Sequence, residues 1–200
     1  MAVHELQLPL DEARIRSLRS GDQVFLTGRL VTGRDVAHKY MIEHRPDFLR
    51  DLLRGTFIYH LGPIVKPVPV SEDAPVGWEI VAAGPTTSIR EEPYQAEVIR
   101  EFGLAGAIGK GGMGPSTLAG LREHGAVYLH APGGCATVLA RAIRKVVAVH
   151  KLEEFGSPEA FWVLDVERFP AVVTMDSHGE SLHRLVLEAS ESRLKALLES

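Results

Sequence analysis

Residues 78–90, WEIVAAGPTTSIR, and residues 104–114, LAGAIGKGGMG, are the stretches that decide how this chain folds. In each, an apolar run typical of a buried strand leads into a glycine-containing loop, and a helical pattern follows. Strand, loop and helix repeated in this order are typical of an α/β fold with right-handed parallel crossovers. Both loops are therefore expected at the carboxyl edge of a sheet, where folds of this class bind ligands.

The remaining sequence extends this alternation in both directions. Helices are predicted at 11–18, 34–43, 93–102, 116–124, 134–150 and 182–198. Strands are predicted at 23–27, 56–60, 78–83, 104–108, 126–130, 161–166 and 171–175, with a proline-rich surface loop at 66–75. The pattern predicts an α/β fold with a mixed sheet, antiparallel on its two flanks, in a single domain over residues 1–200.

The composition limits the class of protein. The 200 residues are 45% hydrophobic and carry a net charge of -4, which argues against nucleic acid as the main partner. The single cysteine, Cys135, excludes an intrachain disulfide and an all-cysteine metal site, and it indicates reducing, cytoplasmic conditions. Residues 1–10 lack the pattern of a signal peptide, and no stretch reaches the roughly 20 apolar residues of a membrane span. We interpret Cys135, His38, His44 and His60 as structural residues.

Three loops bring together groups that bind anions. The first loop supplies the hydroxyls of Thr86 and Thr87 and the guanidinium of Arg90, and the glycine loop supplies the ammonium of Lys110. Arg34 lies in a third loop, earlier in the chain. Since a planar guanidinium suits a carboxylate or a phosphate, we predict that these loops form half of an active site for a small dicarboxylate.

Each of these groups also has a structural interpretation. A hydroxyl of the first loop could cap the helix that begins near Pro93, and Asp35 could favour its own helix or orient Arg34 through an ion pair. The glycine loop is not a nucleotide P-loop, because Gly111 stands where Ser or Thr must follow Lys110. This loop instead predicts a lysine beside an anion-binding nest of backbone amides.

Five segments, in order along the chain, resemble a known family. They are VTGRDVAH (31–38), YHLGP (59–63), GPTTS (84–88), GKGGMG (109–114) and APGGC (131–135). The chain is similar to the iron–sulfur hydro-lyases, and among them to the β subunit, or carboxy-terminal domain, of class I fumarases and L(+)-tartrate dehydratases. The resemblance covers residues 6–183.

The resemblance implies a swivelling β/β/α fold and a site shared by two subunits. The family holds a [4Fe–4S] cluster on three cysteines of a partner α subunit, with two copies of each subunit in a heterotetramer. By the same resemblance, Arg34, Arg90 and Lys110 clamp the substrate carboxylates, and Thr87 hydrogen-bonds the substrate. Thr86 is implied to lie at the reacting carbon as the catalytic base.

The activity that the resemblance implies is reversible hydration of a C4 dicarboxylate, and the motifs resemble those of tartrate dehydratases as much as those of fumarases. We favour fumarate and (S)-malate over tartrate and oxaloacetate because fumarate hydration is the commoner metabolic role. Family members usually have a methionine where this chain has Glu91, and this carboxylate either tunes the choice of substrate or points to solvent. Two other classes of function stay open from the residues alone. One is a non-catalytic module that binds a dicarboxylate, and the other is phosphoryl transfer, which the missing Ser or Thr after Lys110 disfavours.

Overall fold

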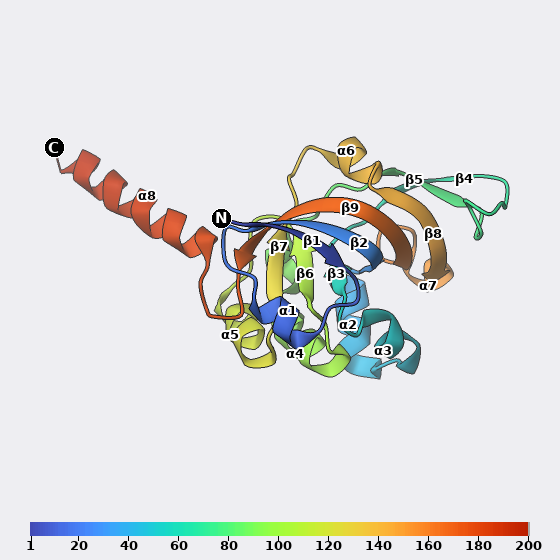
Figure 1. Ribbon diagram of the computed structural model, residues 1–200, viewed down its shortest axis with the longest axis horizontal. Helices are drawn as coiled ribbons and strands as arrows, with labels where there is room; N and C mark the ends of the chain where they lie inside the picture. Colours follow the sequence, from blue (N-terminus) through green and yellow to red (C-terminus); the bar gives the residue numbers. More distant parts are fainter. Residues whose placement is uncertain (200) are drawn as a thin grey trace.

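The computed structural model describes residues 1–199, whose strands and helices are labelled in Figure 1. The strands are β1 (Val3–Gln7), β2 (Gln23–Thr32), β3 (Phe57–Tyr59), β4 (Ile64–Pro67), β5 (Trp78–Ala82), β6 (Gly106–Gly109), β7 (Val127–His130), β8 (Ile143–His150) and β9 (Phe161–Met175). The helices are α1 (Glu12–Arg16), α2 (Asp35–His44), α3 (Asp47–Leu53), the 3-10 turn η1 (Ser88–Glu91), α4 (Glu92–Phe102), α5 (Pro115–His124), α6 (Ala136–Ala140), α7 (Leu152–Phe155) and α8 (Leu182–Leu198).

Within residues 1–199, seven strands form one mixed sheet in the order β1-β2-β3-β6-β7-β9-β8. β2 pairs with β9 as well as with β3, so β2, β3, β6, β7 and β9 close into a five-stranded barrel. The first four of these strands run parallel to one another, whereas β9 is antiparallel to β2, β7 and β8. The predicted α/β fold with a mixed sheet is confirmed.

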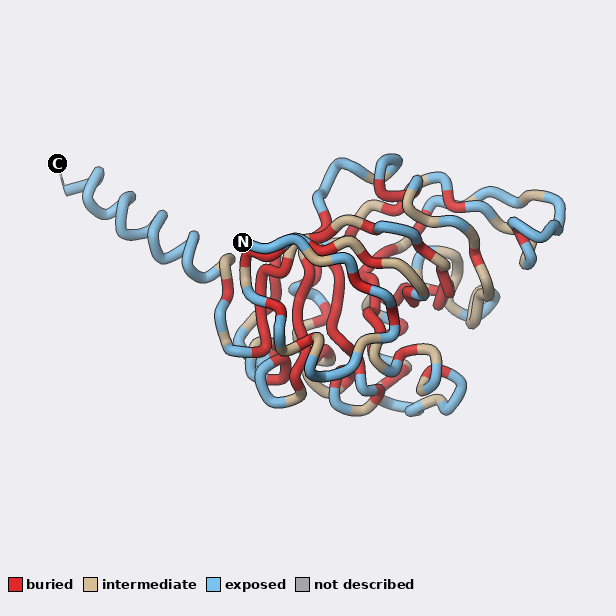
Figure 2. The backbone as a smooth tube through the Cα atoms, in the orientation of Figure 1, coloured by how far each residue is buried: buried red, intermediate tan, exposed pale blue. Residues whose placement is uncertain are grey.

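Alternation along the strands divides the buried side chains between the two faces of the sheet. In β3, Phe57 and Tyr59 belong to the cluster inside the barrel, whereas Ile58 packs with Met41 of α2 and Val98 of α4 on the outer face. Helices α2, α3, α4 and α5 cover this outer face (Figure 1), and the buried segments run through the centre of the body (Figure 2). Loops, and not these helices, therefore lie at the carboxyl edge of the parallel strands.

Some predicted elements are wrong. The helix predicted at 134–150 is only the short helix α6, and its second half is strand β8, whose β-branched side chains suit pairing with β9. The strands predicted at 161–166 and 171–175 are one strand, β9, which continues through Arg168 at a φ of 51°.

Two strand pairings also differ from the prediction. The amino-terminal flank is parallel rather than antiparallel, because the unpredicted strand β1 pairs with β2 in parallel. Strand β5 pairs with β4 in a separate hairpin and does not join the barrel, so it takes no part in a parallel crossover. Only β6, α5 and β7 form the predicted parallel strand–helix–strand unit in this part of the chain.

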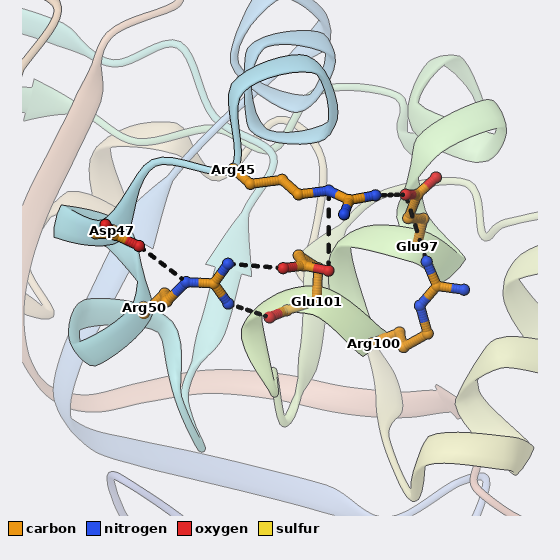
Figure 3. Close-up of polar contacts among 6 residues, drawn as sticks. All are labelled: Arg45, Asp47, Arg50, Glu97, Arg100 and Glu101. Atoms are coloured by element: carbon orange, nitrogen blue, oxygen red, sulfur yellow. Dashed lines mark hydrogen bonds and ion pairs between the residues drawn. The ribbon is translucent and has the colours of Figure 1, made fainter.

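A surface cluster of charged side chains joins the helices of the outer face (Figure 3). Arg50 of α3 donates to Asp47 and to both the carboxylate and the carbonyl of Glu101 on α4. Arg45, at the end of α2, pairs with Glu97 and Glu101. The Arg50 guanidinium lowers the pKa of the Glu101 carboxyl, so this carboxylate stays ionised at neutral pH. The cluster ties α2 and α3 to α4, the helix that follows the first loop.

The carboxy-terminal helix α8 projects away from the body of the molecule (Figure 1), and most of its length is exposed (Figure 2). Its first turn is capped by Ser181, whose hydroxyl accepts from the amide of Arg184 at 3.3 Å. In residues 1–199, no helix combines the length and the apolar character needed to cross a bilayer.

Candidate active site

The parallel strands of the barrel end at one edge, and the predicted loops meet there. The amide of Thr86 donates to the carbonyl of His60, which follows β3, at 2.8 Å. The Thr86 carbonyl accepts from the amide of Lys110, which follows β6, at 3.3 Å, and the Ser88 amide donates to the Lys110 carbonyl at 3.1 Å. These bonds confirm that residues 84–90 and the glycine loop are neighbours.

The two threonine hydroxyls of the first loop remain able to bind a ligand. Thr86 is half-buried, and its Oγ1 donates to the His60 carbonyl at 3.0 Å, which leaves the oxygen lone pairs free to accept. Thr87 is exposed, and its hydroxyl makes no hydrogen bond within residues 1–199. Neither hydroxyl caps η1 or α4, so the helix-capping interpretation is wrong.

Both predicted arginines have carboxylate partners. Arg34, whose side chain is 18% exposed, has its Nε 3.5 Å from an oxygen of Glu159, and Glu159 also accepts from the amide of Val36 at 3.1 Å. Arg90 donates to Asp35. The prediction that Asp35 orients Arg34 is therefore wrong, because its partner is Arg90. A guanidinium has five N–H donors, so each arginine keeps donors for a ligand.

Lys110 is half-buried and has no ion pair within the part of the chain that the structure describes. The anion-binding nest expected beside it is already filled. Glu92 accepts from the amides of Gly114, Ser116 and Thr117 at 2.8, 2.9 and 3.2 Å, and from the Thr117 hydroxyl at 2.6 Å. This carboxylate satisfies the first turn of α5, so these amides bind an anion as predicted but are not free for a ligand, and Lys110 remains the candidate ligand-binding group of this loop.

A chain of buried polar side chains, which the sequence patterns did not reveal, lies beneath the loops. His60 Nδ1 lies 2.7 Å from Ser88 Oγ, which also accepts from the Tyr128 hydroxyl at 2.9 Å. His60 Nε2 and His38 Nε2 lie 2.9 and 3.1 Å from the side-chain amide of Gln95. All five side chains are fully buried, and they connect the first loop to α2, α4 and β7. A polar residue at a buried helix position, such as Gln95, is the kind of signal that could have pointed to them.

Burial keeps His38 and His60, the two histidines among these buried polar side chains, neutral. It lowers the pKa of His38, and it lowers the pKa of His60 well below its usual value. His38 Nδ1 lies 2.9 Å from the carbonyl of Arg34, so in the neutral ring this nitrogen carries the hydrogen and donates it, and His38 Nε2 donates nothing to Gln95. The two imidazoles therefore support the loops, in agreement with their interpretation as structural residues.

Glu91, where the family pattern has methionine, is buried beside Asp35 and Arg90. Its side chain is 1% exposed, so the alternative in which it points to solvent is wrong. Burial and the neighbouring Asp35 carboxyl together raise the pKa of Glu91 to about 8.

The cysteine content decides whether this chain could hold the cluster that the resemblance implies. Cys135 is exposed, directly before α6. Residues 1–199 contain no group of three His, Cys, Asp or Glu side chains placed to hold a metal ion. A cluster bound by three cysteines does not fit a chain with one cysteine, so these residues do not form its binding site.

Gly109 packs against the buried polar chain so closely that no side chain fits. A Cβ at this position would overlap Ser88 Oγ and lie 3.1 Å from His60 Nδ1. We expect Gly109→Ala to lower the free energy of unfolding by about 1–3 kcal/mol, because overpacking forces these side chains apart. Gly133→Ala is the matched control, since a Cβ there would meet only the Lys110 side chain, at 3.4 Å. Urea unfolding measures both, and equal stability of the two variants would contradict the expectation.

Comparison with known proteins identifies the family. A family model described as "Fumarase C-terminus" matches residues 2–186. A Geobacillus stearothermophilus protein named "Putative fumarate hydratase class I" is 50% identical over 194 residues, which are 97% of this chain but 36% of that protein. The L(+)-tartrate dehydratase subunit beta of Escherichia coli (strain K12) is 40% identical over 178 residues, 88% of this chain and 85% of the relative. This chain therefore belongs to the fumarase C-terminal family.

Proposed function

We propose that this chain is the β subunit of an iron–sulfur hydro-lyase that interconverts fumarate and (S)-malate, with its [4Fe–4S] cluster on a separate α subunit. The observation that carries the proposal is the meeting of Arg34, Arg90 and Lys110 with two threonine hydroxyls at one edge of the barrel. A dicarboxylate is held best by cations at both ends, and these three come from three separate loops. The name of the Geobacillus relative supports fumarate as the substrate.

The carboxylate partners of the arginines prepare them to bind a substrate. Glu159 and Asp35 each hold one side of a guanidinium, so the remaining N–H donors of Arg34 and Arg90 are already oriented. Lys110 adds a cation that has no ion pair within residues 1–199. Each charge-assisted hydrogen bond to a substrate carboxylate contributes roughly 1.5–3 kcal/mol.

Thr86 supplies the hydroxyl at the reacting carbon in this proposal. Removing water across a C–C bond requires a base at the carbon next to the leaving hydroxyl, and an alcohol is a weak base on its own. In this chain the Thr86 hydroxyl donates to a backbone carbonyl, which cannot take its proton. The group that takes the proton therefore belongs to the α subunit. The cluster of that subunit supplies Lewis-acid assistance to the leaving hydroxyl when bound.

The proposal includes the assembly. Residues 1–200 form a single domain in a cytoplasmic heterotetramer with two copies of each subunit, and a swivelling motion of this domain closes its loops over the substrate. Exposed apolar side chains next to the arginines support a protein partner at this edge, because Val36 is 44% exposed and Ile89 is 51% exposed.

Anaerobic co-expression with the α subunit from the same source tests the proposal. We expect turnover of (S)-malate only by the cluster-loaded complex, and none by either chain alone. A complex that turns over L-tartrate and not (S)-malate would change the proposed substrate and keep the reaction class. L-Tartrate is the second candidate because the Escherichia coli relative is named L(+)-tartrate dehydratase subunit beta. Failure to form a complex, with dicarboxylate binding by this chain alone, would favour a non-catalytic binding module.

A further inference from the structure

The carboxyl group of Glu91 is buried without a hydrogen-bond donor. Both of its oxygens lack a partner among the described residues. The turn that carries it, η1, packs against α2, and the Glu91 carboxyl lies within hydrogen-bonding reach of the Asp35 carboxyl. Asp35 Oδ1 is likewise buried and without a partner, whereas Asp35 Oδ2 accepts from Arg90.

Two adjoining carboxyl groups with unsatisfied oxygens require a proton between them. Ionised carboxylates only accept hydrogen bonds, and two buried ones repel each other. One proton between Glu91 and Asp35 Oδ1 satisfies an oxygen of each group and leaves Asp35 Oδ2 for Arg90. The proton resides on Glu91, because the Arg90 guanidinium favours the ionised form of Asp35.

We propose that Glu91 is a positioning residue: as a neutral carboxylic acid it donates a hydrogen bond to Asp35 and thereby holds the Asp35–Arg90 pair in place for a substrate carboxylate. The inference rests on the proposed function for the role of Arg90 as a substrate clamp. A pKa of about 8 for Glu91 agrees with a neutral acid at pH 7. A methionine, expected here from the family pattern, has no such proton to donate.

Other charged and titratable groups surround the pair. They are Arg34, at the start of α2, and His38 within it, Arg90 of η1, Tyr128 of β7, and Glu159 of the segment before β9. Burial lowers the pKa of His38 and raises that of Tyr128, so both stay neutral as the pH rises through 8. Burial also raises the pKa of Glu159, but this carboxylate forms its ion pair with Arg34 and not with Arg90. The change of charge near pH 8 therefore belongs to Glu91 and Asp35.

Loss of the shared proton has two measurable consequences. It places a second negative charge beside Asp35 that competes for Arg90, so the KM for the dicarboxylate rises above about pH 8 while kcat changes little. It also affects folding, because the folded protein keeps a proton that the unfolded chain releases near the ordinary value of 4.5. This contribution to stability is complete below pH 4.5 and is lost as the pH rises through about 8.

The direct test is 13C NMR of the full chain, labelled at the side-chain carboxyl carbons of glutamate and titrated between about pH 4 and about pH 10. The resonance that disappears in Glu91→Gln identifies Glu91. We expect its midpoint near pH 8, a lower midpoint in Asp35→Asn, which removes the neighbouring charge, and a higher one in Arg90→Gln, which removes the cation. Opposite shifts are not expected of a residue that only fills space.

Glu123→Gln, which changes an exposed glutamate of α5, is the matched control and should leave the Glu91 titration unchanged. A Glu91 midpoint near the ordinary value, or one that neither Asp35→Asn nor Arg90→Gln moves, would overturn the proposal even if the complex is inactive. In an active complex, we expect KM to rise severalfold between pH 7 and pH 9 for the unaltered protein but not for Glu91→Gln. An equal rise of KM in the unaltered protein and in Glu91→Gln would refute the role of Glu91 in positioning Arg90. An inactive complex in which Glu91 titrates with a midpoint near pH 8 would refute only the proposed function.

Discussion

Thr86→Ala is expected to lower kcat of the reconstituted complex by about 100- to 10,000-fold, the range typical for loss of a group that transfers a proton. The substitution removes a hydroxyl that the His60 carbonyl holds in place at 3.0 Å, but it keeps the backbone bonds from Thr86 to His60 and Lys110. KM should change little, because the cations that bind the carboxylates are untouched. Steady-state kinetics under anaerobic conditions measures both constants.

Two further variants make the Thr86 result specific. Thr86→Ser keeps a hydroxyl at the same position and should retain a large part of kcat. Thr137→Ala removes an exposed threonine of α6 and should leave kcat unchanged. Cluster content, followed by visible absorbance, must be equal in all complexes. Near-normal turnover by Thr86→Ala would remove this residue from the mechanism.

Arg90→Ala is expected to lower kcat/KM by about 100- to 10,000-fold. Two charge-assisted hydrogen bonds from its guanidinium to a carboxylate are worth about 1.5–3 kcal/mol each, and about 1.4 kcal/mol corresponds to a factor of ten. The loss should exceed that of a surface ion pair, because Asp35 already orients the guanidinium before substrate binds. The measurement is kcat/KM of the reconstituted complex for the better of the two acids.

Arg100→Ala is the matched control for this prediction. The side chains of Arg90 and Arg100 are both 56% exposed, and each pairs with one carboxylate, Asp35 and Glu97 respectively. Arg100 lies within α4, in the surface cluster of Figure 3, so its loss should leave kcat/KM nearly unchanged. If Arg90→Ala and Arg100→Ala have equal effects, Arg90 does not bind the substrate.

Local patterns predicted the elements whose contacts are mostly local. Segment 78–90 contains strand β5, a loop and the turn η1, and segment 104–114 contains strand β6 and the loop that leads into α5, because apolar runs, glycines and helical spacing act over a few residues. Strand β8 was predicted as helix because its state depends on pairing with β9, which follows later in the chain. The closure of the barrel by β2 and β9 has the same cause, since it joins residues such as Val31 and Val163. Patterns within a short window carry no information about such pairings.

The residues of the candidate site fall into the same two groups: those that local sequence patterns predicted and those that only the tertiary structure revealed. The sequence identified the five groups proposed to bind or act on a substrate, because each stands in a loop that follows or precedes a recognisable element, and the structure brings these loops together. Their roles stay predictions until the variants above are measured. The sequence did not identify Glu159 as the partner of Arg34, nor Gln95 as the link between His38 and His60.

The sequence by itself determined which chemical groups are present and in which loops they stand, because loop and helix starts follow from residues only a few positions apart. Only the tertiary structure decided which carboxylate holds which arginine, since Asp35 and Arg90 are 55 residues apart and meet through the packing of α2 against η1. It also decided the state of Glu91, because a carboxyl group becomes a neutral acid only when the fold buries it beside another carboxylate.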